Sequence, residues 1–596
     1  MRLSHLGLTK LLRRPHPSYL LTPRLHRQKN SSRGFLYKGF LNSIMKDYKK
    51  IIFEAAAGVL DGLEIGDVQK AEEFCDYCIP CFKFAKVLRK APAIIAKEAA
   101  ERLSLDGMEV SALNGYLNFT VKREANISAA LNYTPGEFKP YSGKTVCLDY
   151  SSVNIAKPFH IGHLMTTVIG GSLHKIYKAL GANAVGINHL GDFGTQFGGL
   201  ISAYRRWGDD KRLAERGLDE LLELYVKFHN ESEKDDKLMA EAREWSGKIE
   251  SGDPYAVGLF DRFKSITLEQ AKRVYDRLNI EFDSYLGESF FVDKVAAVEK
   301  KLTAKNLLKI SDGAEIVEVG DDMPPALIRR SDGASLYIAR DLAAAYYRRE
   351  TYGFDKCLYV VASHQALHFK QLFKVLELLG EPWTTGMTHV SYGMVSVDGV
   401  GLSTRKGNVL FLNDVLDAAV KKAAAIIDER NPSLENKDAV SESVGVGAVV
   451  FGALYDGRIK DKNFSLDAAL NFDGETGPYV QYTHARCISV LGKAGKKAGE
   501  LKNIDVKLLC DDEAYEVARL IVDFDEVVYS AAQKYEPSFV SRRLVKICQA
   551  FNRFYNADRI MCGGEQERAR LALTAKVAET LKYGLSLVLL DAPERM

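Results

Sequence analysis

Residues 144–192 read KTVCLDYSSVNIAKPFHIGHLMTTVIGGSLHKIYKALGANAVGINHLGD, and this stretch decides the fold class. It opens with a short apolar run at 144–152, continues with apolar residues at helical spacing, and closes on a second apolar run at 183–192. Two buried strands joined by one helix form a strand–helix–strand unit whose strands lie parallel. The stretch therefore predicts an α/β protein built on a doubly wound parallel sheet.

The same alternation of strand and helix returns later in the chain. It reappears in three apolar segments, 334–350, 356–363 and 388–397. Long charged segments with helical spacing separate the two halves, so we expect a helical insertion at about 205–320. The sheet domain is therefore predicted to span 141–414.

Two further domains are predicted on either side of the sheet domain. Residues 45–140 mix helical spacing with β-rich runs and end in an aromatic strand candidate at 113–121, which predicts a small α+β domain. Residues 415–596 are rich in Ala, Leu, Lys and Glu at helical spacing, which predicts an all-α bundle.

The first 44 residues differ in charge from the rest of the chain. They hold nine Lys and Arg and no Asp or Glu, a composition typical of an organelle transit peptide. We favour instead a basic, disordered extension, because Met45 begins MKDYKKIIFEAAAG, a natural start for the folded part. We expect a cytoplasmic protein, with a mitochondrial address as the alternative. No uncharged apolar stretch reaches the roughly 18 residues that cross a bilayer, so no membrane association is expected.

The nine cysteines are scattered through the chain, which is typical of reduced thiols. Cys75, Cys78 and Cys81 form a C-x-x-C-x-x-C run that could bind a metal if a fourth ligand joined it. No second cluster follows at a suitable spacing. The aromatic residues between the cysteines indicate packing, so we expect no metal site.

His160 and His163 stand at the start of the helix that follows the first strand. They could be metal ligands, although the usual H-E-x-x-H pattern is absent, or polar residues at a helix start. A third interpretation is a phosphate site, because helix N-termini at the end of such strands attract anions. Gly162 leaves room for a nucleotide against the backbone, and imidazole donors can stabilise charge on an attacked phosphate. We favour the third interpretation.

The residues HIGH (160–163) after a strand resemble the first signature of class I aminoacyl-tRNA synthetases, and SSVNIAKPFHIGHL (151–164) resembles the arginyl-tRNA synthetase form. Other stretches resemble motifs of the same family, in the family's order, so that the likeness runs from about 45 to 596. They are NHLGDFGTQFG (188–198), YDRLNIEFDSYLGES (275–289), SDGASLYIARDLA (331–343), STRKGN (403–408), FDGETGPYVQYTHAR (472–486) and DAPERM (591–596).

The resemblance implies a Rossmann-like, HIGH-type catalytic domain between an N-terminal tRNA-contacting domain and a C-terminal anticodon-binding bundle. It implies that L-arginine is activated with ATP and Mg²⁺ to arginyl-adenylate and then joined to the terminal adenosine of tRNA(Arg). It also implies that tRNA binds before activation. We expect a monomer.

The resemblance assigns the ATP site to His160, Gly162 and His163, together with His368, Gly393, Met394 and Val395. The second class signature, a mobile loop with a phosphate-neutralising lysine, here reads GVGLSTRKGN, and Gly401 replaces that lysine. Lys157 is predicted to supply the missing charge, with Arg405 and Lys406 still in the loop. A solvated lysine at a helix end is the alternative for Lys157.

The arginine and tRNA sites also follow from the resemblance. Asp149 is expected to bind the α-ammonium group and Asn154 to orient the carboxylate, whereas Tyr337, Asp341 and Gln365 are expected to hold the side chain. Asp341 would pair with the guanidinium, although it could instead be a helix N-terminal charge. Candidate tRNA contacts are Asn114, Tyr116, Asn118, Tyr482, Arg486 and Arg542. For Tyr116, a strand core position is the alternative.

Three other functions fit the sequence less well. A protein kinase is excluded because D-F-G (192–194) precedes the R-D-L (340–342) and Tyr346 stands where asparagine is required. A nucleotidyltransferase would not explain the long helical C-terminal region. A non-catalytic tRNA-binding paralogue is disfavoured by His160, Gly162 and His163, and favoured only by Gly401.

Overall fold

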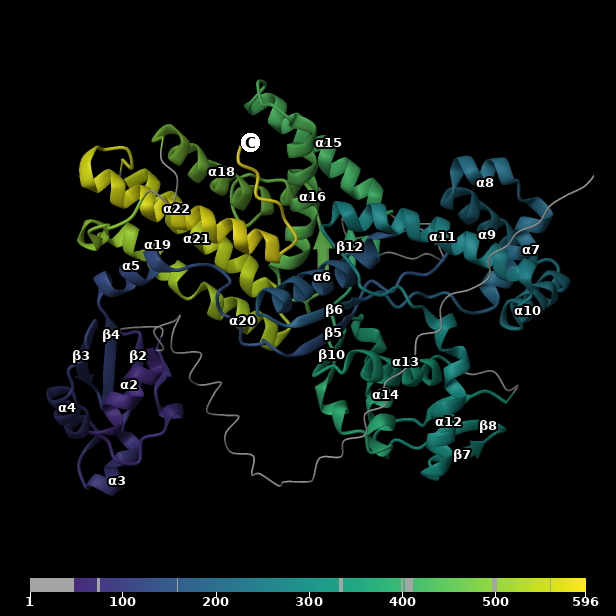
Figure 1. Ribbon diagram of the computed structural model, residues 1–596, viewed down its shortest axis with the longest axis horizontal. Helices are drawn as coiled ribbons and strands as arrows, with labels where there is room; N and C mark the ends of the chain where they lie inside the picture. The colour runs from purple at the N-terminus through teal and green to yellow at the C-terminus, as the bar shows by residue number, and fades with distance from the viewer. Residues whose placement is uncertain are drawn as a thin grey trace, which may run out of the picture.

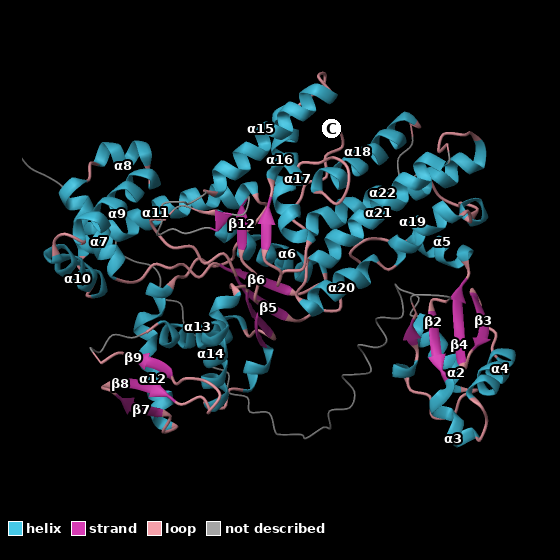
Figure 2. Cartoon of the chain, turned by 180° about the vertical axis from the view of Figure 1, so that it is seen from behind, coloured by secondary structure: helices cyan, strands magenta, loops and turns pink. Residues whose placement is uncertain are grey.

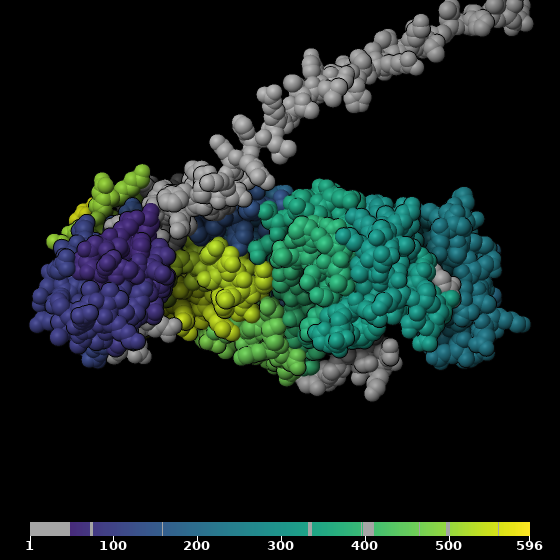
Figure 3. All heavy atoms as spheres, turned by 90° about the horizontal axis from the view of Figure 1, so that it is seen from below, coloured from purple at the N-terminus to yellow at the C-terminus, as the bar shows by residue number. Residues whose placement is uncertain are grey.

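The computed structural model describes residues 48–71, 75–157, 159–331, 336–397, 400–401, 411–495, 501–557 and 559–596. The molecule is elongated, with the N-terminal domain at one end, a helical insertion at the other and the parallel sheet between them (Figure 1). The space-filling view from below shows the C-terminal bundle between the N-terminal domain and the sheet domain (Figure 3).

The central sheet has four strands in the order β11 (Met387–His389), β10 (Lys356–Tyr359), β5 (Thr145–Asp149) and β6 (Asn183–Ile187). All neighbouring strands are parallel. The predicted α/β class with a doubly wound sheet is thus confirmed. The apolar run at 388–397 is divided, however, because its second half forms β12 (Val395–Val397) of a separate small sheet with β13 (Val400–Gly401) and β14 (Lys462–Phe464).

The sheet separates two hydrophobic cores, since successive side chains of a strand point to opposite faces. Val146 and Leu148 of β5 join the core that contains α6 (Leu164–Ala179) and the C-terminal bundle. Cys147 joins the other core, formed with α12 (Val295–Ala304), α13 (Tyr337–Tyr352) and α14 (Ala366–Leu378). A strand buried on both faces explains why its sequence is a continuous apolar run.

The N-terminal domain has its own antiparallel sheet and core, seen apart from the other elements in Figure 2. Its strands and helices are β1 (Gln69–Lys70), β2 (Tyr77–Pro80), β4 (Tyr116–Val121), β3 (Met108–Leu113), α2 (Tyr48–Ala57), α3 (Ala85–Leu88) and α4 (Pro92–Arg102). The next helix, α5 (Arg123–Asn132), buries Ile127 and Ala130 in the core of the bundle.

Five helices follow β6 in the insertion, at one end of the molecule (Figure 1). They are α7 (Thr195–Trp207), α8 (Asp210–Arg216), α9 (Leu218–Ser232), α10 (Asp236–Glu250) and α11 (Pro254–Arg277). An antiparallel sheet of β7 (Leu308–Ser311), β8 (Ala314–Val317) and β9 (Ala326–Arg329) was not predicted. Its strands are only four residues long and β7 is mostly exposed, so that of the three only β9 alternates between buried and exposed residues. The turn residues Asp312 and Gly313, both at positive φ, were the available signal.

The C-terminal region is helical, as the 3.6-residue spacing indicated. Its long helices are α15 (Leu412–Arg430), α16 (Lys437–Tyr455), α18 (Gly477–Lys493), α19 (Asp512–Val522), α20 (Phe524–Lys534), α21 (Ser538–Ala557) and α22 (Gly564–Leu587), with the short α17 (Leu466–Ala469). In the described part of the chain, α16 alone is long and apolar enough to cross a membrane by length and composition. It is mostly buried against α15, α18 and α21, as expected of a core helix.

Candidate functional site

His160 and His163 lie where β5 leads, through residues 150–159, into the short helix η3 (Ile161–His163) and then α6. The backbone N–H of Gly162 donates to His160 Nδ1 at 3.1 Å. The backbone N–H of His160 donates to His163 Nδ1 at 3.2 Å. The two imidazole centroids are 3.8 Å apart, so the rings form one unit at the helix start.

These hydrogen bonds determine which ring nitrogen carries the proton. A backbone N–H can only donate, so Nδ1 of each histidine accepts, and in a neutral ring the proton lies on Nε2. Burial, together with the positive charge of Lys157, lowers the pKa of His160. Burial and the neighbouring His160 lower the pKa of His163 to about 3. The partly exposed rings are therefore two neutral Nε2–H donors at pH 7.

The position of the His160 ring requires a glycine at position 162. A Cβ at this position would lie 2.8 Å from two atoms of the His160 imidazole. Real Cβ contacts are longer, so a side chain would push the ring away from the Gly162 N–H. The glycine therefore allows His160 to fold back on its own backbone, a reason different from the nucleotide approach we expected.

Lys157 lies beside the two histidines and against the insertion. Its ammonium is 5.2 Å from the ring centroid of Tyr225 on α9, and its charge lowers the pKa of both histidines. Lys157, Phe159 and Phe411 border a cavity of about 220 Å³. A cation is thus placed next to the neutral imidazoles.

One of the two described flanks of the second signature meets the histidines. Gly401 ends β13, where it pairs with Ser396. Phe411, where the description resumes, pairs with His160 in an antiparallel bridge. Arg405 and Lys406 lie outside the described residues.

The other predicted ATP residues divide into two groups. The N–H of Gly393 donates to the Arg458 carbonyl, and a Cβ would lie 2.6 Å from the Lys460 carbonyl oxygen. Met394 is exposed, and Val395 pairs with Lys462 across β12 and β14. His368 lies elsewhere, because its Nε2 is 2.7 Å from Asp341 Oδ2. It is therefore part of the predicted arginine pocket.

Asp149, at the end of β5, is held by a partner that the sequence did not indicate. Its Oδ2 lies 2.8 Å from Nη2 of Arg348 on α13, and both side chains are buried. Its Oδ1 accepts a hydrogen bond from the Ser152 hydroxyl at 3.1 Å. The same Nη2 lies 3.3 Å from Nδ1 of His189, after β6. His189 in turn places Nε2 3.8 Å from Asp341 Oδ1.

The contacts from Asp149 to Asp341 belong to a cluster of four carboxylates and three cations. Asp149 pairs with Arg348, Asp192 pairs with Lys264 at 2.6 Å, and Glu288 pairs with Arg340 at 3.0 Å. Burial raises the pKa of Glu288 to about 7 although Arg340 opposes the shift. Within the described residues, the fourth carboxylate, Asp341, contacts only His368 and His189. The cluster therefore has one carboxylate without a protein cation.

Asp341 is nevertheless ready to bind a cation. Burial favours the neutral acid, but the hydrogen bond with His368 and the neighbouring His189 and Arg348 outweigh it and lower the pKa of Asp341. The carboxylate is therefore ionised at pH 7.

The other three predicted arginine contacts are exposed. Asn154 lies against Gly191, where a Cβ would be 2.1 Å from its Oδ1, and the two residues form a parallel bridge. Tyr337 begins α13 with 63% of its surface exposed, and Arg340 stacks on its ring at 5.1 Å. Gln365 ends the short helix η5 (Ser363–Gln365) before α14. In the described structure, no side-chain hydrogen bond or ion pair joins these three to Asp341, although Tyr337 precedes it by one turn of α13.

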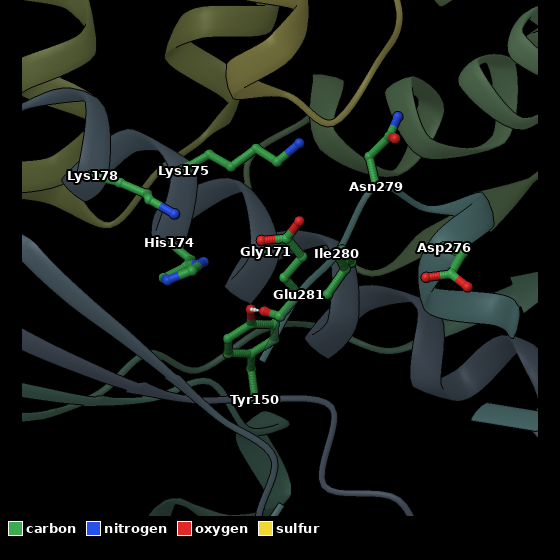
Figure 4. A pocket seen from close by; sticks show the side chains of 9 residues that line it. All are labelled: Tyr150, Gly171, His174, Lys175, Lys178, Asp276, Asn279, Ile280 and Glu281. Atoms are coloured by element: carbon green, nitrogen blue, oxygen red, sulfur yellow. Dashed lines mark hydrogen bonds between the residues drawn. The ribbon is translucent and has the colours of Figure 1, made fainter. Parts of the chain in front are cut away.

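A separate cavity of about 290 Å³ lies at the opposite end of α6 (Figure 4). His174, Lys175 and Lys178 of α6 line one side, and residues 279–281 line another. His174 and His163 are eleven residues apart, which is roughly 16 Å along a helix. This cavity is therefore distinct from the histidine pair.

The predicted tRNA contacts lie on two domains. Asn114 occupies the β3–β4 turn at φ 50°, Tyr116 is 39% exposed and packs edge-on against Phe82, and Asn118 is buried in the sheet. In the bundle, Arg486 stacks between the exposed rings of Tyr482 and Tyr555 at 4.9 and 5.3 Å. Arg542 is exposed and donates from Nε to the Tyr455 carbonyl.

The described residues contain no group of three His, Cys, Asp or Glu that could hold a metal ion. Cys75, Cys78 and Cys81 are free thiols. Cys81 is buried in the core of the N-terminal domain, and burial raises its pKa to about 11, so its thiol is protonated at pH 7.

Three family models match the chain. The catalytic domain of class I (R) tRNA synthetases matches residues 127–466, the DALR anticodon binding domain matches 480–596, and the arginyl-tRNA synthetase N-terminal domain matches 44–121.

Similar proteins span nearly the whole chain. The arginine–tRNA ligase of Alkaliphilus metalliredigens is 45% identical over 93% of this chain and all of its own length. That of Clostridioides difficile is 46% identical with the same coverage. The solved arginyl-tRNA synthetase of Thermus thermophilus superposes with a TM-score of 0.78 at 25% identity, covering 92% of this chain and 100% of that one.

Proposed function

The chain belongs to the class I arginyl-tRNA synthetases, and from that premise we propose how its residues share the work of joining arginine to tRNA(Arg). The reaction has two stages. The carboxylate of arginine attacks the α-phosphate of ATP, which gives arginyl-adenylate and releases pyrophosphate. A hydroxyl of the terminal adenosine of tRNA then attacks the activated carbonyl, and AMP leaves.

The observation that carries the arginine assignment is Asp341, the carboxylate of the cluster that pairs with no Lys or Arg among the described residues. Three of the four carboxylates in the cluster have a Lys or Arg partner. The ionised carboxylate of Asp341 matches the positive charge of the guanidinium of arginine. Asp341 binds the guanidinium, which can donate two parallel hydrogen bonds to one carboxylate. Asp149 binds the α-ammonium with the acceptor positions that Arg348 and Ser152 leave, since a carboxylate accepts about four hydrogen bonds.

Asn154, Tyr337 and Gln365 complete the arginine site from its exposed side. Asn154 orients the carboxylate of arginine, because its exposed amide lies against Gly191, just after β6. Tyr337 and Gln365 close over the side chain of arginine, since both begin helices that carry pocket residues, α13 and α14.

ATP binds at the start of α6. The Nε2–H groups of His160 and His163 donate to the α-phosphate, where negative charge grows during attack. Because both rings are neutral, they stabilise this charge without losing a proton. Lys157 supplies the full positive charge, aided by Arg405 and Lys406. Gly393, Met394 and Val395 border the adenosine, and His368 lies between the nucleotide and Asp341.

Magnesium enters as part of the Mg–ATP substrate. Mg²⁺ keeps most of its water and binds through substrate phosphates rather than through a protein cage. This fits a site whose described residues offer no group of three metal ligands.

The tRNA contacts lie on two domains, the N-terminal domain and the C-terminal bundle. Asn114 and Tyr116 meet unpaired bases on the N-terminal domain, with Asn118 supporting them from within the sheet, since aromatic rings and amides suit unstacked bases. Tyr482, Arg486 and Arg542 form the corresponding surface of the bundle. Activation of arginine waits for tRNA, the enzyme works as a monomer, and it resides in the cytoplasm unless residues 1–44 direct it to mitochondria.

Pyrophosphate exchange tests these assignments. We expect exchange with arginine but not with lysine, and only when tRNA(Arg) is present. Asp341→Asn should raise the KM for arginine by about 10- to 100-fold, the loss of one charge-assisted hydrogen bond, and leave the KM for ATP unchanged. The control is Asp293→Asn, an exposed carboxylate that pairs with Lys294. An unchanged KM for arginine in Asp341→Asn would refute the guanidinium assignment.

A further inference from the structure

We propose that His189 and Arg348 are positioning residues, which link the two substrate carboxylates Asp149 and Asp341 into one buried chain and hold them at a fixed separation. The inference rests on the proposed roles of Asp149 and Asp341. The two linking residues come from different segments, since His189 follows β6 and Arg348 lies on α13.

Arg348 fixes the orientation of His189. A guanidinium only donates hydrogen bonds, so the His189 nitrogen that faces it, Nδ1, must accept. Burial lowers the pKa of His189, which keeps the ring neutral. A neutral ring that accepts at Nδ1 carries its proton on Nε2. The Nε2–H therefore faces Asp341.

The Nε2 atom of His189 is an exception among the buried polar atoms. It is inaccessible to solvent and has no hydrogen-bond partner among the described residues, because Asp341 Oδ1, at 3.8 Å, is beyond hydrogen-bond range. A buried donor without a partner costs about 1–3 kcal/mol. Such groups in a native structure need an explanation, and alignment with a carboxylate that binds substrate provides one.

The contacts from Asp149 through Arg348 and His189 to Asp341 are held rigidly by the packing around them. The ring of His189 stacks on Phe291 with centroids 5.5 Å apart. The guanidinium of Arg348 lies 5.3 Å from the ring of Tyr359 on β10, and only 2% of Arg348 is exposed. His368 contacts the other oxygen of Asp341. Asp341 is thus confined between two imidazoles, so its orientation is set before arginine arrives.

The inference is tested with two substitutions at His189. His189→Phe keeps the ring and its stacking but removes both polar nitrogens. We expect it to raise the KM for arginine about tenfold and leave the KM for ATP and the melting temperature close to those of the unchanged enzyme. His189→Gln retains one acceptor and one N–H donor, and it should restore most of the affinity for arginine.

Two further variants guard against loss of folding and against a purely structural effect. Arg348→Lys keeps a positive charge near Asp149 but lacks the guanidinium Nη2 that contacts both Asp149 and His189, so it should raise the KM for arginine and still fold. His174→Phe is the matched control, because His174 is also buried but hydrogen-bonds the Ala184 carbonyl at the far end of α6 (Figure 4). It should leave the KM for arginine unchanged.

Asp341→Asn in the same assay distinguishes the positioning role of His189 and Arg348 from the proposed role of Asp341 in binding arginine. If Asp341→Asn raises the KM for arginine and neither His189→Phe nor Arg348→Lys does, the positioning role is refuted and the proposed function stands. A parallel rise of both KM values with a lower melting temperature in His189→Phe would also refute it. An unchanged KM in Asp341→Asn would overturn the proposed function and the inference together.

Discussion

The nucleotide end and the arginine end of the site handle charge in opposite ways. At the nucleotide end, two neutral imidazoles are held by their own backbone, and Lys157 is the cation that the described residues place beside them. At the arginine end, four carboxylates and three cations are packed into one cluster. One end therefore acts through fixed dipoles, and the other through a balance of full charges that is one cation short.

The difference follows from what each end must do. Charge on the α-phosphate grows only during the reaction, and neutral donors stabilise it without a strong attraction for the ground state. The guanidinium of arginine is charged from the start, so its partner must be an ionised carboxylate whose burial is offset by neighbours. Substitutions at the two ends should accordingly change different kinetic constants.

The largest effect is expected at the nucleotide end. His163→Ala removes one preorganised donor, which should lower the rate constant of tRNA-dependent pyrophosphate exchange by about 10²- to 10³-fold with little change in the KM for arginine. A higher KM for arginine with an unchanged rate constant would contradict the division of roles between the two ends of the site. His174→Ala on the same helix is the control, and it should keep the exchange rate.

The sequence predicted these two ends unequally, and the reason is physical. The histidine pair depends on contacts within four residues, so HIGH after a strand was sufficient to place it. The arginine cluster joins residues 149, 189, 288, 341 and 348, which only the folded sheet brings together. Asp341 and Arg348 are seven apart on one helix face, which was a usable signal. Nothing in the sequence indicates that His189 lies between them.

Lys157→Ala should have an intermediate effect. It removes the full positive charge beside the imidazoles, so we expect the exchange rate constant to fall about 10- to 100-fold, the loss of one charge-assisted contact, with the affinity for arginine retained. The matched control is Lys227→Ala, a lysine that also stacks on an aromatic ring of the insertion, Trp207. Equal rates in the two variants would mean that Lys157 only packs on Tyr225 and does not supply the positive charge at the nucleotide end.

The smallest effect is expected for the protonation of His163, which should not change near neutral pH. Its pKa of about 3 in the folded protein is below the ordinary value of 6.5, so the unfolded chain binds this proton first as the pH falls. The stability that the neutral ring contributes is complete above pH 6.5 and is lost progressively toward pH 3. NMR of histidine-labelled protein, with His163→Gln used to assign the signal, should show no change in the His163 ring between pH 5.5 and 8. A midpoint near 6.5 would mean that the ring becomes cationic at the nucleotide end, and the contrast between fixed dipoles and full charges would fail.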